Sequence, residues 1–182
     1  MNPHFWWYVS RASGIISWLM ITGSVIWGVI LSTKAFPEQR RPAWILDLHR
    51  WLGGLAVGFL VLHLGALMLD GYTDFGLADL LIPGHSAWRP GSVALGVVAA
   101  WTLVAVEGTS LAMKKLPKKV WRGIHLTSYA TFWLTSLHAA FAGSDRSTFL
   151  YQITALGSIV AVAWAAMYRV TNRRSLSRRT AS

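Results

Sequence analysis

The sequence contains no cysteine and few charged residues. Lys, Arg, Asp and Glu make up 13% of its 182 residues, whereas soluble domains usually carry about a quarter. Without cysteine, the chain has no disulfides, no Cys-ligated iron–sulfur cluster, no thioether-attached cofactor and no cysteine nucleophile. No His-Glu-x-x-His or Gly-x-Ser-x-Gly motif is present, so a membrane-embedded hydrolase is poorly supported.

Long apolar runs make up most of the chain. Hydrophobic residues account for 54% of the sequence and the mean hydropathy is +0.43. Several uncharged runs approach the roughly twenty residues that a helix needs to cross a bilayer. We therefore expect one all-α domain over residues 1–182, a polytopic membrane bundle of five transmembrane helices. The expected spans are 13–32, 48–69, 92–113, 120–141 and 149–168, followed by a basic tail at 169–182.

The net charge of +10 is better explained by membrane topology than by nucleic acid. Lys and Arg gather in the connection between spans one and two, in that between spans three and four, and after span five. Cytoplasmic loops carry this excess of positive residues. The sequence thus predicts an outside N-terminus, a cytoplasmic C-terminus, membrane lipids as partners and no nucleic-acid partner. A bacterial cytoplasmic (inner) membrane is the expected location.

Four of the histidines lie in two of the expected spans. His49 and His63 are fourteen residues apart in span two, which leaves them only ~40° from sharing one line along a helix. His125 and His138 are thirteen apart in span four, or ~140° apart on a straight helix. Span four is therefore expected to bend, bulge or overwind, unless its two histidines serve groups on different sides.

The expected topology places the four histidines in two layers. His49 and His125 lie at the cytoplasmic ends of their spans, and His63 and His138 lie near the outer ends, roughly 20 Å away at 1.5 Å per residue. Each layer has two imidazoles, which can hold one haem iron from both sides. Such an iron has no open position and suits electron transfer. The alternative is interhelical hydrogen bonding, the ordinary role of a lone intramembrane histidine.

These residues resemble the ferric reductase-like transmembrane domain family. The resemblance is carried by Leu-His-Arg at 48–50 with His63, by the fourteen and thirteen spacings, and by Ser-Arg-Ala-Ser-Gly at 10–14. It covers about residues 10–168. The family includes the membrane cores of NADPH oxidases and iron reductases, and the haem-binding subunit that feeds periplasmic methionine sulfoxide reductase. It implies two b-type haems, or one if a single pair is used, ligated by His49, His63, His125 and His138.

Two departures from the family shape the expected function. Many members have a further helix at the N-terminal end. The oxidases and iron reductases also continue into flavin- and nicotinamide-binding domains, whereas no dinucleotide-binding fingerprint occurs here. We therefore expect no flavin or nicotinamide site in this chain. Electrons would come from a separate flavoprotein reductase or membrane quinol and pass to an extracytoplasmic redox acceptor.

The expected function is that of a membrane b-type cytochrome, the electron-transfer subunit of an oxidoreductase system. One alternative is a cytochrome b anchor of a quinone-linked dehydrogenase or hydrogenase complex. Another is a haem-free small membrane transporter or assembly factor that uses its histidines for metal or proton handling. An absorption spectrum distinguishes the haem-free class from the other two.

Three arginines are candidates to bind haem propionates, because an arginine fork matches a carboxylate. Arg50 and Arg122 are placed by the sequence at the inner layer and Arg11 at the outer. The alternative for Arg50 and Arg122 is the ordinary positive-inside role. Arg11 stands on the outer side, where that rule does not favour a basic residue.

Glu107 and two histidines outside the spans, His4 and His85, complete the candidates. An acidic residue inside a span, such as Glu107, is a candidate for proton transfer or for structural pairing. Lys114 or a hydroxyl of span four is its expected structural partner. His4 and His85 lie outside the spans on the outer side, where they either contact an electron acceptor or are simply solvated. A short helix at 75–82 is expected to lie on the membrane surface.

Overall fold

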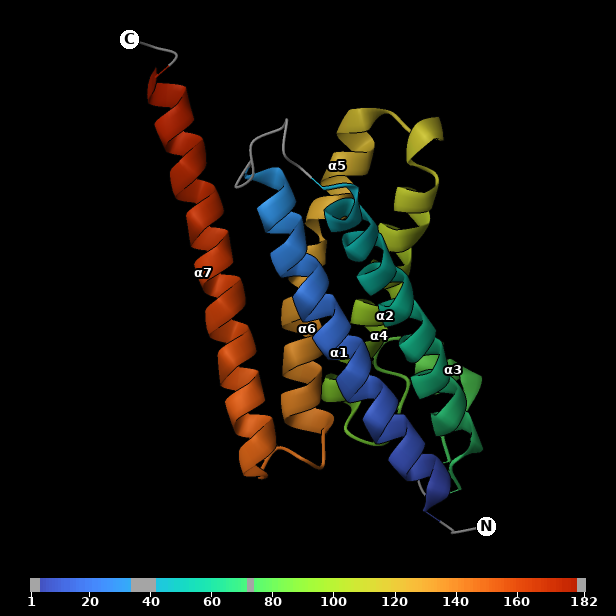
Figure 1. Cartoon of the computed structure of the whole chain (residues 1–182). Coiled ribbons are helices and arrows are strands. Elements are labelled where there is room, and N and C mark those ends of the chain that lie inside the picture. Colours follow the sequence, from blue (N-terminus) through green and yellow to red (C-terminus); the bar gives the residue numbers. More distant parts are fainter. Residues whose placement is uncertain (1–3, 34–41, 72–73, 180–182) are drawn as a thin grey trace.

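The chain folds as a bundle of helices (Figure 1). The computed structural model describes residues 4–33, 42–71 and 74–179, with side chains described as far as residue 171. Three prolines mark helix starts, at Pro42, Pro90 and Pro117, where the N–H that proline lacks is not needed. The helices are α1 (Phe5–Ser32), α2 (Ala43–Leu69), α3 (Leu77–Leu81), α4 (Pro90–Leu111), α5 (Lys118–Leu126), α6 (Ser128–Ala142) and α7 (Phe149–Arg179), with a 3₁₀ turn at Met113–Lys115.

Four helical segments are long and apolar enough to cross a membrane. They are Phe5–Ser32, Ala43–Leu69, Pro90–Leu111 and Phe149–Thr171, which correspond to four of the five expected spans. Large apolar side chains on their outward faces, such as Val61 at 64% exposure, are suited to lipid contact. The all-α class is confirmed, and the chain has the helices of an integral membrane protein.

The predicted span 120–141 is divided into two helices. α5 has 9 residues and α6 has 15, and they meet at Thr127. The Thr127 N–H donates to the carbonyl of Ile124 at 2.9 Å, three residues back instead of four, which tightens the turn as in a 3₁₀ helix. The distortion that the thirteen-residue histidine spacing predicts therefore lies at Thr127, two residues after His125 and about a third of the way along the predicted span.

The helices pack in two principal pairs. α1 runs along most of α2, α4 packs against α6, and α7 lies beside α1 (Figure 1). Polar bonds fix the register between helices: Ser17 Oγ donates to the Ala56 carbonyl at 2.9 Å, and Trp18 Nε1 donates to Ser136 Oγ at 3.0 Å. Such bonds supply specificity in an apolar bundle. The central core consists of Ile21, Val25, Ala56, Leu103, Phe132 and Val162, all buried.

The connection between α2 and α4 packs more deeply than the sequence predicts. The expected helix at 75–82 is found as α3, but its Leu80 is buried against α4. Trp101 Nε1 donates to the carbonyl of Leu81 at 3.0 Å, and Trp101 lies about 16 Å along α4 from its first residue. α3 therefore covers the side of α4 and does not simply rest across its end.

Candidate functional site

The four intramembrane histidines form two close pairs. The ring centroids of His49 and His125 are 5.9 Å apart with an interplanar angle of 71°. Those of His63 and His138 are 6.5 Å apart with an angle of 81°. These are the pairs that the sequence predicts, and they make α2 parallel to the α5–α6 segment. Along α2 the two pairs are separated by roughly 21 Å, from fourteen residues at 1.5 Å each.

Both histidines of α2 donate a hydrogen bond to α1. His63 Nδ1 is 2.8 Å from the carbonyl oxygen of Ser10, and His49 Nδ1 is 3.1 Å from that of Ser24. A carbonyl oxygen can only accept, so each Nδ1 carries the proton. A neutral imidazole protonated at Nδ1 has its lone pair on Nε2, which is the nitrogen available to a metal.

Both histidines of the α5–α6 segment are bonded through Nδ1 to a serine of α4. His138 Nδ1 is 2.7 Å from the Ser92 carbonyl oxygen, whereas His125 Nδ1 is 3.2 Å from the hydroxyl oxygen of Ser110. The Ser110 hydroxyl gives its own proton to the Val106 carbonyl at 2.7 Å, so its oxygen accepts from His125. All four histidines thus have Nδ1 bonded to a serine of the neighbouring helix. A metal-binding histidine is usually fixed by such a bond to its second nitrogen.

Three of these serines begin a Ser-x-x-x-Gly sequence, at 10–14, 24–28 and 92–96. In an α-helix the carbonyl of residue i is bonded to the N–H of residue i+4, so the glycine stands directly beside the carbonyl that accepts the imidazole. With no side chain there, the ring can reach an oxygen that already has a backbone partner.

Replacing these glycines would obstruct the imidazoles. A Cβ at Gly96 would lie 2.7 Å from His138 Nδ1, one at Gly14 3.0 Å from His63 Nδ1, and one at Gly28 3.3 Å from His49 Cε1. All three distances are tighter than ordinary van der Waals contact. The glycines therefore provide the close approach that the histidines need.

The sequence did not identify Ser24–Gly28 and Ser92–Gly96 as functional, although a signal was present. Ser10 and Ser24 are fourteen residues apart, as are His49 and His63. Equal spacing on two antiparallel helices lets both serine–histidine bonds form at once. This match of spacings was the available clue.

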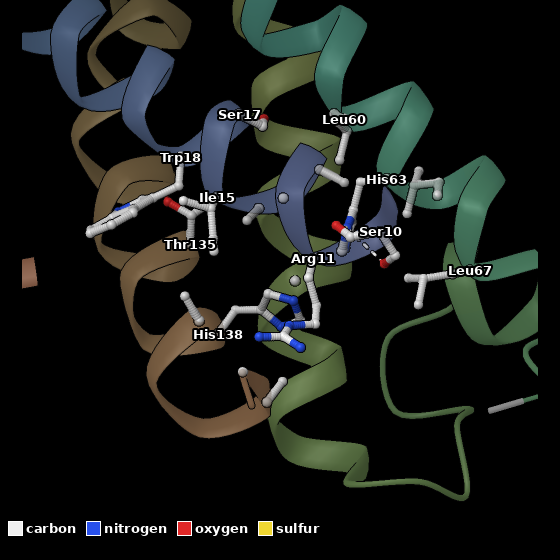
Figure 2. Close-up of a pocket in the computed structure, with 18 of the residues that line it drawn as sticks. Ser10, Arg11, Ile15, Ser17, Trp18, Leu60, His63, Leu67, Thr135 and His138 are labelled. Atoms are coloured by element: carbon white, nitrogen blue, oxygen red, sulfur yellow. Dashed lines mark hydrogen bonds between the residues drawn. The ribbon is translucent and has the colours of Figure 1, made fainter. Parts of the chain in front are cut away.

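A cavity opens beside the outer pair, between α1, α2, α4 and α6 (Figure 2). It has about 1320 Å³ of space, including its open part. His63 and His138 both line it, together with apolar side chains such as Leu60 and Leu67. An apolar cavity with a few polar groups is typical of a cofactor site.

Arg11 lines the same cavity but already has a carboxylate partner. Its Nε donates to Asp145 Oδ2 at 3.0 Å, and its Nη2 contacts Asp145 Oδ1. Asp145 belongs to the connection between α6 and α7, so this pair ties that connection to α1. The Arg11 side chain remains 32% exposed. The predicted contact of Arg11 with a haem propionate would have to be shared with Asp145.

The other two predicted arginines lie at the surface. The Arg50 side chain is 64% exposed, and its Nη1 is 3.5 Å from Asp47 Oδ1. Arg122 is exposed on α5. The structure therefore gives neither side chain a buried position at the inner pair.

Glu107 lies between α4 and α2, one helical turn from the inner pair. A Cβ at Gly53 would stand 2.1 Å from its Oε1, and Gly53 follows His49 by four residues. Within the described part of the chain, neither Lys114 nor a hydroxyl of the α5–α6 segment bonds this carboxylate, contrary to the expected pairing. The absence of a side chain at Gly53 leaves the space that the carboxylate occupies.

His85 and His4, the two histidines outside the predicted spans, have different surroundings. His85 Nδ1 donates to Asp79 Oδ1 at 2.9 Å, and the Gly76 N–H donates to Asp79 Oδ2 at 2.9 Å. These bonds hold the pKa of the Asp79 carboxyl below its ordinary value, and the bond from His85 has the larger effect. His85 thus holds the α2–α4 connection together. His4 stands immediately before α1.

The chain was compared with protein-family models and with solved structures. No family model matches the chain, and no solved structure matches it significantly.

Within residues 4–33, 42–71 and 74–179, no group of three or more His, Cys, Asp or Glu side chains is placed to hold a metal ion. The paired histidines are therefore the metal-ligand candidates that the described structure offers, with two ligands in each pair.

Proposed function

We propose that this chain is a membrane b-type cytochrome that carries electrons across the bilayer through two haems. His49 and His125 would ligate the inner haem, and His63 and His138 the outer. The observation that carries the proposal is the arrangement of the four imidazoles: two facing pairs in which every Nδ1 is bonded to a serine of the adjacent helix. This leaves each Nε2 as the ligand nitrogen.

The distances between the rings fit the proposed group. A metal–imidazole nitrogen bond is about 2 Å long, so two rings on opposite sides of one iron have centroids about 6 Å apart. The centroid distances of 5.9 and 6.5 Å agree with this value. Two protein ligands per site is also the number that bis-histidine haem requires, because the porphyrin supplies the other four nitrogens.

The protein itself orients the histidine rings and excludes water from the space between the two pairs. The serine bonds fix the tautomer and direction of each ring, and the glycines allow those bonds to form. Ile21, Ala56, Leu103 and Phe132 form a buried apolar layer between the two pairs. When bound, haem iron supplies reversible one-electron chemistry, tuned by its ligands and by burial.

The topology that completes the proposal has five spans, with α5 and α6 together forming the fourth. Lys and Arg gather at one side of the chain's spans, which supports an outside N-terminus and a cytoplasmic C-terminus. The inner pair then faces a flavoprotein or quinol donor, and the outer pair faces an extracytoplasmic acceptor. The resemblance to the ferric reductase-like transmembrane domain family supports the same assignment, in a bacterial cytoplasmic membrane.

Sealed vesicles test electron transfer directly. The haem-loaded protein is reconstituted into vesicles that contain ferricyanide, and dithionite is added outside. We expect rapid reduction of the trapped ferricyanide, with the rate falling to that of protein-free vesicles when His49 or His63 is replaced by alanine. Haem-loaded wild-type protein that gives no more reduction than protein-free vesicles would contradict the proposed function.

Ser110→Ala is expected to weaken the inner haem site selectively. The hydroxyl is the acceptor for His125 Nδ1, so its removal frees the ring to rotate, and loss of such a partner typically costs 10–100-fold in metal affinity. We expect about ten-fold faster haem loss from the inner site. Ser92→Ala is the control, because His138 bonds to the Ser92 carbonyl, which alanine retains, and the Ser92 hydroxyl bonds to the Arg89 carbonyl. This variant should keep the inner haem as in the wild type. Equal haem retention in both variants would count against this role for Ser110.

Removing the charge of Arg11 and removing that of Asp145 should shift the midpoint potential of the outer haem in opposite directions. Arg11→Gln leaves the Asp145 carboxylate uncompensated, which favours the more positive, oxidised haem and lowers the midpoint potential. Asp145→Asn leaves Arg11 uncompensated and should raise it. Redox titration of both variants, with the exposed Arg146→Gln as control, checks the sign. A titration that all three leave unchanged would place Arg11 and Asp145 away from the haem.

A further inference from the structure

The inner histidine pair has a basic neighbour that the sequence did not indicate. Arg169 lies on α7 and is half-buried. Its Nη1 donates to the Tyr129 hydroxyl at 3.0 Å, and its guanidinium carbon is 5.8 Å from the centre of that ring. Tyr129 follows His125 by four residues, about one helical turn along the α5–α6 segment. The side chain is therefore directed into the bundle at the inner pair.

Within the described residues, the charge of Arg169 has no acidic partner. Among the described residues, the carboxylate–guanidinium pairs are Arg11 with Asp145 and Arg50 with Asp47, and Arg169 has only the neutral Tyr129. A cation within a membrane helix is costly and normally pairs with an anion or extends to the interface. Arg169 instead turns inward, toward a place where an anion would balance it.

A second unmatched donor stands at the same pair. The Trp121 ring is stacked on His125, with centroids 5.1 Å apart and an interplanar angle of 28°. Its Nε1 is buried and has no hydrogen-bond partner among the described residues. Buried polar groups are almost always bonded in native proteins, so such an N–H calls for an acceptor that the described residues do not supply.

We propose that Arg169, assisted by Trp121, is the anion-binding subsite of the inner pair and holds a carboxylate of the haem bound there. This inference rests on the proposed function. It assigns to α7 the role that the sequence assigns to Arg50 and Arg122. An arginine fork suits a carboxylate geometrically. The bond would also join α7 to the cofactor, in addition to its contact with Tyr129.

The test uses a chain that holds only the inner haem. In a His63→Ala background, Arg169→Gln is compared with Arg50→Gln and Arg122→Gln, which are matched in chemistry but exposed. We expect Arg169→Gln to increase haem dissociation about ten-fold or more, as for loss of a charge-assisted bond, and to shift the midpoint potential to more negative values. The two control variants should behave as their parent.

Two conservative variants separate this role from a structural one. Arg169→Lys keeps the charge but loses the fork, so we expect an intermediate dissociation rate. Trp121→Phe keeps the stacked ring and loses the N–H, so we expect a smaller change in the same direction as Arg169→Gln. If Trp121→Phe changes neither the haem dissociation rate nor the midpoint potential, the indole N–H does not bind the haem carboxylate.

The outcomes that would overturn the subsite differ from those that would overturn the proposed function. If the inner haem is bound and Arg169→Gln behaves like the two controls, the subsite is wrong and the cytochrome assignment stands. If the effect of Arg169→Gln appears in vesicles with anionic lipid but is absent in phosphatidylcholine, the anion is a lipid phosphate and the proposal is also wrong. If the wild-type chain binds no haem, the proposed function itself fails.

Discussion

Replacing His63 or His138 by alanine is expected to remove the outer haem and leave the inner one in place. Under the proposed function each haem would be held by two imidazoles of this chain, and the outer pair is separated from the inner by roughly 21 Å of α2. The haem-to-protein ratio should therefore fall by half, with one redox component lost from a potentiometric titration. His49→Ala and His125→Ala should remove the other component.

His85→Ala is the matched control for these variants. His85 is bonded to Asp79 in the α2–α4 connection and belongs to neither pair. Its replacement should leave the haem content and both redox components unchanged. Retention of both components in His63→Ala and His138→Ala would contradict the assignment of the outer ligands, provided that each variant is purified as a folded protein.

Gly96→Ala should disrupt the outer site almost as strongly, although Gly96 is not a ligand. The added Cβ would stand 2.7 Å from His138 Nδ1, so the ring must leave the Ser92 carbonyl or the helices must separate. Overpacking of this kind costs about 1–3 kcal/mol, and loss of the orienting bond costs about 10–100-fold in metal affinity. We expect the outer haem to be largely lost, as measured by the outer component in a redox titration.

The other glycines provide graded comparisons. Gly14→Ala places a Cβ 3.0 Å from His63 and should act on the same outer haem, whereas Gly28→Ala, at 3.3 Å from His49, should act more mildly on the inner haem. A Cβ at Gly58 or Gly65 meets no atom within 4 Å. Alanine there should retain both haems and, because alanine favours helix by about 1 kcal/mol, preserve or raise stability. Gly96→Ala with a full outer haem would contradict the role of these glycines.

Hydrophobic run length and histidine positions were sufficient to predict the four long helices and the two pairs. The four long apolar helices follow from uncharged runs that only a helix can place in a bilayer. The pairs follow from spacing on α2, because His49 and His63 lie on one face whatever the packing. The thirteen-residue spacing predicted either a distorted span four or histidines that serve groups on different sides. Neither glycine nor proline marks Thr127, so the position of the distortion emerged only in the structure.

Partners distant in the sequence were not predictable from a single chain. Nearness to His49 and His125 in sequence drew attention to Arg50 and Arg122, whereas the inward-facing arginine, Arg169, comes from another helix. Asp145 reaches Arg11 across 134 positions. Such contacts depend on how α7 and its preceding connection pack. The Ser-x-x-x-Gly sequences, by contrast, could be found by comparing serine spacing on one helix with histidine spacing on the next.

The most direct test of the account is the haem content of the purified protein together with its reduced-minus-oxidised absorption spectrum. Two facing imidazole pairs predict about two low-spin b-type haems per chain, each in a six-coordinate bis-histidine form. A ratio near one would leave a single pair in use. A folded protein without low-spin haem bands would contradict the central claim that these histidines ligate haem.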